Sequence, residues 1–213
     1  YFKENYNTAV ANLPYVNSPI NITKVEVWIT NKTGETTDSR NIISFLDLGE
    51  TDGNIQNTVF TTSLPGNFPD NDRANDMYQN LLNNYTSQSD PNLGIRDINQ
   101  VNNELSDLSN PPVNFTAGQD YEKLERARKL KETEYTIHPQ LGYISLNQSL
   151  NNDEVLAVAF QYTIGNEVFQ VGELTSNGPS APATLIVKLL KGTTFSPSLM
   201  NWELMMKNIY ALG

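Results

Sequence analysis

Alternating apolar and polar residues near the start of the chain predict two β-strands. In residues 24–30, Val25, Val27 and Ile29 lie on one side and the residues between them on the other, as in a half-buried strand. A second apolar run, residues 42–48, ends at a glycine and predicts a second strand. The simplest arrangement is an antiparallel pair formed by these two segments.

In the middle of the chain the apolar residues take up helical spacing. Residues 77–85, 98–108 and 118–132 each place apolar side chains three or four positions apart, which puts them on one face of a helix. Pro111 and Pro112 forbid extension of the second helix. The third helix is predicted from the stripe Tyr121, Leu124, Ala127 and Leu130.

The last third of the chain returns to alternation. The segments "EYTIH" and "GYISLN" flank a turn at Pro139 and predict a hairpin. Residues 155–164 form a longer strand, and "EVFQVGE" is its return strand. The two residues between them, Gly165 and Asn166, suit a tight hairpin turn because both accept positive φ. Residues 183–190 predict one more strand.

These elements indicate an α+β fold: an antiparallel β-sheet or sandwich with about three helices. We treat residues 1–213 as one module, with a subdivision into 1–112 and 113–213 as the alternative. Residues 155–164 alone would also suit a membrane-barrel strand of about ten residues. The short apolar rows of the other strands and the long polar segments between them favour a water-soluble module. We also expect the chain to be excised from a longer protein.

The charge of the chain excludes some classes of partner. The formal net charge is −10 and the sequence pI is about 4.5, so the surface repels phosphate and we expect neither nucleic acid nor anionic lipid as a partner. The chain has no Cys, which excludes thiol nucleophiles and disulfides. Five of the nine residues from Lys123 to Lys131 are basic. They are either a docking patch for an acidic partner or, by our preferred interpretation, a solvated helix face.

The sequence offers little catalytic chemistry. His138 is the single histidine and precedes a proline between two predicted strands, so we place it in a turn. No phosphate-binding loop or two-histidine metal motif occurs. We therefore assign no catalytic, cofactor-binding or metal residue and expect no enzyme and no cofactor.

Two acidic loops are rich enough in oxygen ligands to be weighed as calcium sites. The first holds Asp47, Glu50 and Asp52, and neither it nor the second fits the twelve-residue calcium loop. A solvated turn explains the first loop and helix capping the second, and both explanations are preferred to calcium. The second loop holds Asp70, Asp72 and Asp76.

Several phrases resemble the SprA family, also called Sov. They are "VEVWITNKTGETTDSRNIISFLDLGE", "DYEKLERARKL", "EYTIHPQLGYISLN", "DEVLAVAFQYT", "FQVGE" and "WELMMKNIY". The resemblance covers nearly the whole chain in one order and is strongest from Phe115 onward. Members of that family are very large outer-membrane proteins of Gram-negative bacteria, and they form the translocon of the type IX secretion system, some of whose cargo serves gliding motility and adhesion.

The resemblance implies a non-enzymatic structural module of that translocon, periplasmic or at the cell surface, that shapes or caps the pore. Its implied partners are other secretion-system subunits of the outer membrane and periplasm, secreted protein cargo and the rest of the parent chain. The alternative is a calcium- or glycan-binding surface module, with Trp28, Tyr143 or Trp202 as a sugar platform. A third hypothesis is a hydrolase, which needs a pocket that holds His138 or a close pair of carboxylates.

Overall fold

A computed structural model describes residues 2–49, 77–87, 90, 92–107 and 115–204. The described strands are β1 (Ile20–Ile29), β2 (Ser39–Phe45), β3 (Tyr121–Lys129), β4 (Tyr135–His138), β5 (Tyr143–Leu146), β6 (Leu156–Ile164), β7 (Glu167–Val171) and β8 (Leu185–Lys191). The described helices are α1 (Phe2–Ala11), α2 (Met77–Tyr85), α3 (Val101–Ser106) and the 3₁₀ helix η2 (Met200–Glu203).

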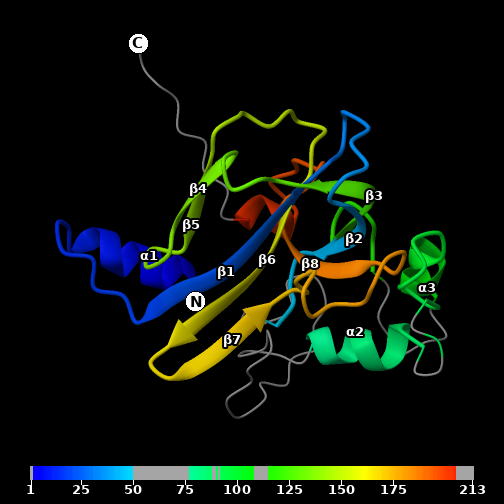
Figure 1. The fold of residues 1–213 in the computed structure, drawn as a ribbon, viewed down its shortest axis with the longest axis horizontal. Helices are drawn as coiled ribbons and strands as arrows, with labels where there is room; N and C mark the ends of the chain where they lie inside the picture. The colour runs from blue at the N-terminus through cyan, green and yellow to red at the C-terminus, as the bar shows by residue number, and fades with distance from the viewer. Residues whose placement is uncertain (1, 50–76, 88–89, 91, 108–114, 205–213) are drawn as a thin grey trace.

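The main sheet closes on itself (Figure 1). Its strand order is β1-β3-β2-β8-β6-β7, and β1 also pairs with β6, so that β1, β3, β2, β8 and β6 form a ring to which β7 is added. The pairs are antiparallel except for β2 and β8, which run parallel. β4 and β5 form a separate antiparallel pair. The predicted α+β class, with a mainly antiparallel sheet and three α-helices among the described residues, is confirmed.

Side chains fill the space enclosed by the ring. All five of its strands contribute to one buried cluster, in which Trp28 of β1 meets Leu124 of β3, Ile42 of β2, Val187 of β8 and Ala157 of β6. Because side chains alternate between the two faces of a strand, a cluster shared by all five strands lies on their common inner face. The ring is therefore a packed core.

The outer faces of the ring are covered by different elements. Helices α2 and α3 pack on β2, β8, β6 and β7 through a cluster that includes Leu81, Leu105, Phe45, Ile186 and Phe169. The β4–β5 pair packs over β1 and β6 through a second cluster with Val27, Tyr135, Leu156 and Val158. Helix α1 lies beside this pair, on the side opposite α2 and α3 (Figure 1).

The two predicted hairpins of the last third are present. β4 pairs with β5, and β6 pairs with β7 through Ile164 and Glu167, which leaves Gly165 and Asn166 as the turn. Gly165 has φ +60°, the conformation that this type of turn requires. Residues 183–190 correspond to β8 and residues 77–85 to α2, as predicted. The helix predicted over 98–108 is shorter, since α3 spans Val101–Ser106.

The helix predicted over residues 118–132 is wrong, because this segment forms strand β3. Its apolar residues recur at every third position, but a helix is not the cause of this spacing. Tyr121 faces outward under α2 and α3, whereas Leu124 and Ala127 both face the inside of the ring. A β-bulge keeps both inward: Glu125 and Arg126 together stand opposite one residue of β2, and Arg126 has φ +50°.

The predicted pairing of residues 24–30 with 42–48 is also wrong. β3 lies between β1 and β2 and pairs with both. Alternation specifies which face of a strand is buried but does not specify its neighbour, so nearness in sequence was a poor guide here. Helix α1 was not predicted, because its sequence "FKENYNTAVA" carries no strong apolar stripe.

In the part of the chain that the structure describes, no helix has the length and apolar character needed to cross a membrane.

Candidate functional site

Arg96 and Glu173 form a buried ion pair beside β8. Arg96 Nη1 donates to Glu173 Oε2 at 2.7 Å, and Nη2 donates to Oε1 at 2.6 Å. The Tyr78 hydroxyl also donates to Oε1, at 2.8 Å, and the Ile186 N–H donates to Oε2, at 2.8 Å. The carboxylate of Glu173 therefore accepts four hydrogen bonds.

The same pair is tied to the backbone on its other side. Arg96 Nη1 donates to the Thr184 carbonyl at 2.8 Å, and the Thr184 N–H donates to the Arg96 carbonyl at 2.9 Å. The side chains of Arg96 and Glu173 are only 8% and 6% exposed. Both oxygens of Glu173 and both terminal nitrogens of Arg96 are thus engaged within the protein, and the pair fastens the α2–α3 connection to the segment that enters β8.

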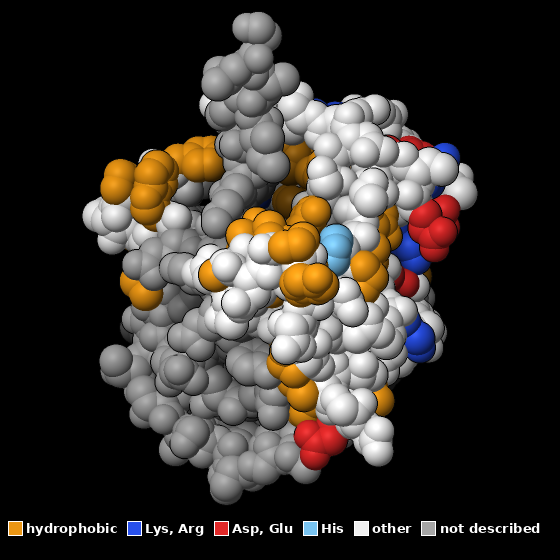
Figure 2. All heavy atoms as spheres, turned by 90° about the vertical axis from the view of Figure 1, so that its left-hand side faces the viewer, with side chains coloured by type: hydrophobic (Ala, Val, Ile, Leu, Met, Phe, Trp, Pro, Cys, Tyr) orange, Lys and Arg blue, Asp and Glu red, His pale blue; other side chains and the backbone are white. Residues whose placement is uncertain are grey.

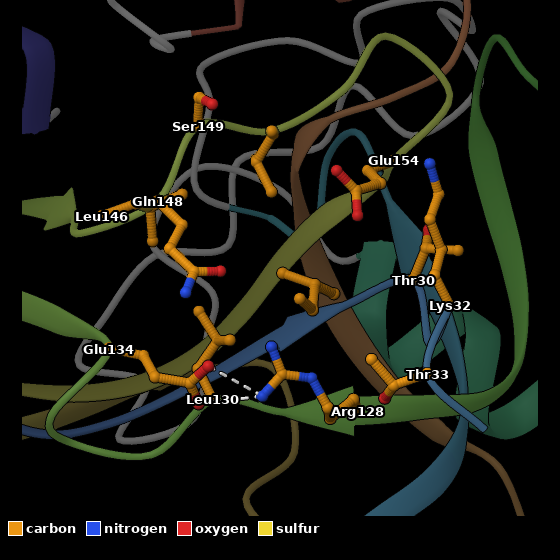
Figure 3. A pocket seen from close by; sticks show the side chains of 12 residues that line it. Thr30, Lys32, Thr33, Arg128, Leu130, Glu134, Leu146, Gln148, Ser149 and Glu154 are labelled. Carbon is orange, nitrogen blue, oxygen red and sulfur yellow. Dashed lines mark hydrogen bonds and ion pairs between the residues drawn. The ribbon is translucent and has the colours of Figure 1, made fainter. Parts of the chain in front are cut away.

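A cavity of about 130 Å³ opens between the ends of β1 and β3 and the segment that joins β5 to β6 (Figure 3). Its apolar lining comes from Ile29, Leu130, Leu146 and Leu150, which belong to or pack against the cluster under the β4–β5 pair. Ile29 and Leu130 are buried, while Leu146 and Leu150 are partly exposed. The cavity is therefore a gap in the outer apolar layer that is open to solvent.

Arg128 and Glu134 line one side of this cavity. Arg128 Nη1 donates to both oxygens of Glu134, at 2.9 and 2.8 Å, and the Lys131 N–H donates to Oε2 at 2.8 Å. Burial acts to raise the pKa of Glu134, but these hydrogen bonds and the nearby positive charges outweigh it, so the pKa is lowered. The second terminal nitrogen of Arg128 points into the cavity (Figure 3) and has no hydrogen bond with any described residue.

Glu154 and Gln148 line the opposite side. The Asn151 N–H and side-chain amide donate to Glu154 Oε2 at 2.6 and 3.0 Å, which leaves Oε1 without a bond to any described residue. The side chain of Gln148 extends toward the centre of the cavity (Figure 3). The charged lining residues are Lys32 and Arg128 against Glu134 and Glu154, so the formal charges of the lining cancel.

These two carboxylates do not resemble a glycosidase pair. A glycosidase needs one carboxylic acid whose pKa is raised so that it stays protonated. The pKa of Glu134 is lowered, and both Glu134 and Glu154 hold neighbouring groups in place.

His138 does not line the cavity. It ends β4, accepts a hydrogen bond at Nδ1 from the Leu141 N–H at 3.2 Å, and stacks on Tyr143 with 5.6 Å between ring centroids.

Of the predicted calcium ligands, the structure describes only Asp47. It is buried, and its Oδ1 accepts a hydrogen bond from the Gly49 N–H at 2.8 Å. Glu50 and Asp52 lie outside the described residues, as does the whole second loop with Asp70, Asp72 and Asp76. Within the described part of the chain, no three His, Asp or Glu residues are close enough to hold a metal ion.

The three proposed sugar platforms differ in exposure. Trp28 is 1% exposed inside the ring, so its proposal as a platform is wrong. Tyr143 is 44% exposed and lies edge-on to Tyr6, and Trp202 is 58% exposed. Figure 2 shows hydrophobic side chains gathered around His138, the only histidine, on the side of the molecule that carries α1.

The basic cluster of residues 123–131 is on a strand, so the preferred interpretation as a helix face is wrong. Most of its charges have carboxylate neighbours. Arg128 contacts Glu134, and Lys129 Nζ lies 3.0 Å from Glu26 Oε1. The cluster is therefore largely neutralised by pairs along the sheet, which also leaves little free charge for an acidic partner. The remaining pairs are Lys123–Glu125 at 3.4 Å and Lys131–Glu35 at 4.0 Å.

Sequence reasoning missed both the Arg96–Glu173 pair and the cavity. The two residues of the pair are 77 positions apart, and a single sequence carries no signal that joins them. The cavity depends on three segments that meet only in the folded chain. The one local signal was Arg128, near the end of an apolar stripe. We interpreted its side chain as part of a solvated helix face.

Neither protein-family models nor curated proteins match this chain.

Proposed function

We propose that this chain is a non-enzymatic structural module of an outer-membrane protein translocon of the type IX secretion system. In this role it shapes or caps the pore and contacts partner subunits or cargo. The observation that carries the proposal is the role of the buried charges: Arg96 and Glu173 are enclosed and bonded to each other, and Arg96 also bonds to the Thr184 carbonyl, so the pair holds separate segments together. The resemblance of the sequence to the SprA family supplies the context of secretion.

The closed sheet suits a rigid support. Its inside is filled by side chains such as Trp28 and Val187, so the described strands leave no channel through the ring. A passage for cargo would have to lie outside the ring, between this module and other parts of the assembly. Rigidity follows from the close packing of the inner core and of the layers on the two outer faces.

The proposal is tested in the intact parent protein in outer membranes. A photo-crosslinking amino acid is placed singly at Tyr15, Val168 and Trp202, which are 82%, 41% and 58% exposed. We expect covalent adducts with distant parts of the parent chain, with other secretion-system subunits or with secreted cargo. Samples kept in the dark are the control. If the protein assembles in the membrane and none of the three positions gives such an adduct, the proposed function is wrong.

A glycan-binding surface is the second candidate, and the exposure of Trp202 favours it. An exposed aromatic ring offers a flat apolar face to a sugar, and the chain has only one other tryptophan, the buried Trp28. Sugar binding at Trp202 would therefore change the fluorescence of this residue alone. A glycan panel that changes the emission of the wild type but not of Trp202→Phe supports this candidate.

Calcium binding by the module is tested by thermal melting with and without calcium. A ligand that binds only the folded state stabilises that state, so calcium binding would raise the melting temperature.

A further inference from the structure

We propose that the cavity lined by Arg128 and Glu154 receives one aliphatic side chain of an extended peptide segment, whose neutral peptide groups bond to the polar residues of the lining. The segment belongs to a partner chain. This inference deepens the proposed function, on which it rests, by naming the chemistry of a partner that docks on the module.

The size of the cavity decides between a small molecule and a side chain. Sites for small molecules and cofactors usually measure about 300–1,000 Å³. This cavity measures about 130 Å³, whereas a dry cavity of about 150 Å³ holds a single benzene molecule. One branched aliphatic side chain fills such a space, and Ile29, Leu130 and Leu146 supply its apolar surroundings.

The polar groups of the lining match a peptide group. The free terminal nitrogen of Arg128 is a donor that points into the cavity (Figure 3). Glu154 Oε1 is an acceptor without a described partner, and the Gln148 amide can both donate and accept. A peptide carbonyl would accept from Arg128, and a peptide N–H would donate to Glu154 or Gln148. Extended peptides expose these two groups on both sides of each side chain.

The charge of the lining argues against a charged ligand. Arg128 is already bonded to both oxygens of Glu134, and Lys32 Nζ lies 2.8 Å from Asp153 Oδ1. An incoming carboxylate would meet Glu134 and Glu154, and an incoming ammonium would meet Lys32 and Arg128. A neutral ligand avoids both repulsions and keeps the formal charges of the lining balanced.

The test uses three leucine probes that differ only in charge. They are N-acetyl-leucine-N-methylamide, which is neutral, N-acetyl-leucine, an anion, and leucine-N-methylamide, a cation. Binding to the full chain is followed by NMR through the methyl groups of Leu130, Leu146 and Leu150. We expect the neutral probe to shift these signals at the lowest concentration. No shift up to the solubility of the neutral probe, or equal or tighter binding of a charged probe, overturns the proposal.

Variants of the chain locate the binding. Arg128→Gln shortens the side chain, so that its amide no longer reaches the position of the free Arg128 nitrogen, and we expect the neutral probe to bind about tenfold more weakly. Glu134→Gln keeps Arg128 but leaves the lining one charge more positive, so the preference moves toward N-acetyl-leucine. If Arg128→Gln does not fold, Leu150→Phe narrows the cavity and is expected to abolish binding. Unchanged affinity of the neutral probe in a folded Arg128→Gln variant, or in Leu150→Phe, overturns the proposal.

The two proposals fail separately. Probe binding without crosslinks in the membrane would retain the peptide pocket and remove the translocon. Crosslinks without probe binding would retain the translocon and remove the peptide pocket.

Discussion

Arg96 and Glu173 face each other through two parallel hydrogen bonds of 2.7 and 2.6 Å in a site where both side chains are almost fully enclosed. Such a two-point contact fixes both orientation and distance. A buried ion pair adds little net stability, because the cost of removing both charges from water offsets their attraction. We interpret this pair as a device that fixes how the α2–α3 connection joins the ring.

Removal of one member of the pair is predicted to be costly. In Arg96→Met the carboxylate of Glu173 stays buried without its cation, which lowers the free energy of unfolding by about 3–5 kcal/mol. Replacement of both residues, Arg96→Met with Glu173→Leu, removes the unpaired charge and is predicted to restore a large part of that loss. Urea denaturation of the wild type and the two variants measures both effects.

The exposed pair between Lys32 and Asp153 is the matched control. Its N–O distance is 2.8 Å, close to that of the buried pair, but its side chains are 40% and 73% exposed. We expect Lys32→Met to change the urea midpoint little, because solvent screens the pair. A loss as large as that of Arg96→Met would show that enclosure is not what makes the Arg96–Glu173 pair important.

Gly94 is predicted to tolerate no side chain. It has φ +67°, and a Cβ atom there would lie 2.3 Å from the Tyr85 carbonyl oxygen, which accepts a hydrogen bond from the Ile95 N–H. Gly94→Ala therefore combines backbone strain with a clash against the backbone that leads to Arg96. We expect a loss of about 3 kcal/mol in the free energy of unfolding.

Gly34→Ala separates the two contributions. Gly34 has nearly the same φ, +68°, but a Cβ atom there would meet nothing within 4 Å. Its predicted cost is about 1 kcal/mol, from strain alone. Equal losses for the two variants in denaturant titrations would mean that the clash at Gly94 is relieved by a backbone shift.

The sequence predicts an element of this fold correctly where its pattern of apolar residues can arise from only one type of secondary structure. Residues 155–164 alternate and end at a Gly-Asn turn, and both signals specify the same hairpin. In β3 the spacing of Tyr121, Leu124 and Ala127 imitates a helix, because the strand is buried on both faces and bulges once. A pattern method that assumes one buried face assigns such a strand to a helix.

The candidate site was less predictable than the fold. Arg128 reaches the cavity only because β3 is a strand. Its partner Glu134, and Glu154 on the opposite side of the cavity, come from segments whose positions depend on the closure of the ring. Closure itself rests on the pairing of β1 with both β3 and β6, which no local signal specifies. The absence of sequence motifs for catalysis, by contrast, could be read from the residues directly.

The two tryptophans are predicted to respond differently to a solvent quencher. Trp202 is 58% exposed and Trp28 is 1% exposed, so acrylamide should quench part of the emission strongly and the rest weakly. Trp202→Phe leaves only Trp28, and its emission is expected at shorter wavelength and with weak quenching. If acrylamide quenches the emission of Trp202→Phe as strongly as that of the wild type, the inside of the ring is open to solvent.

Acid is predicted to weaken the cavity wall through Glu134. The pKa of this carboxyl is lowered in the folded chain from its ordinary value of 4.5, because the Lys131 N–H and the Arg128 guanidinium together outweigh the opposing effect of burial. Where the folded pKa is the lower one, the contribution to stability is complete above the unfolded pKa. It is lost as the pH falls through the folded value.

The free energy of unfolding should therefore fall as the pH drops below about 4.5, and part of that fall should be absent in Glu134→Gln. Urea titrations of both proteins across this range measure the difference, which is expected to be constant above the unfolded pKa and to shrink toward lower pH. A difference that is the same at all pH values would mean that Glu134 acts through hydrogen bonds that glutamine also makes. In that case the negative charge of Glu134 is not what holds Arg128 at the cavity, and the balance of lining charges would have no part in choosing a ligand.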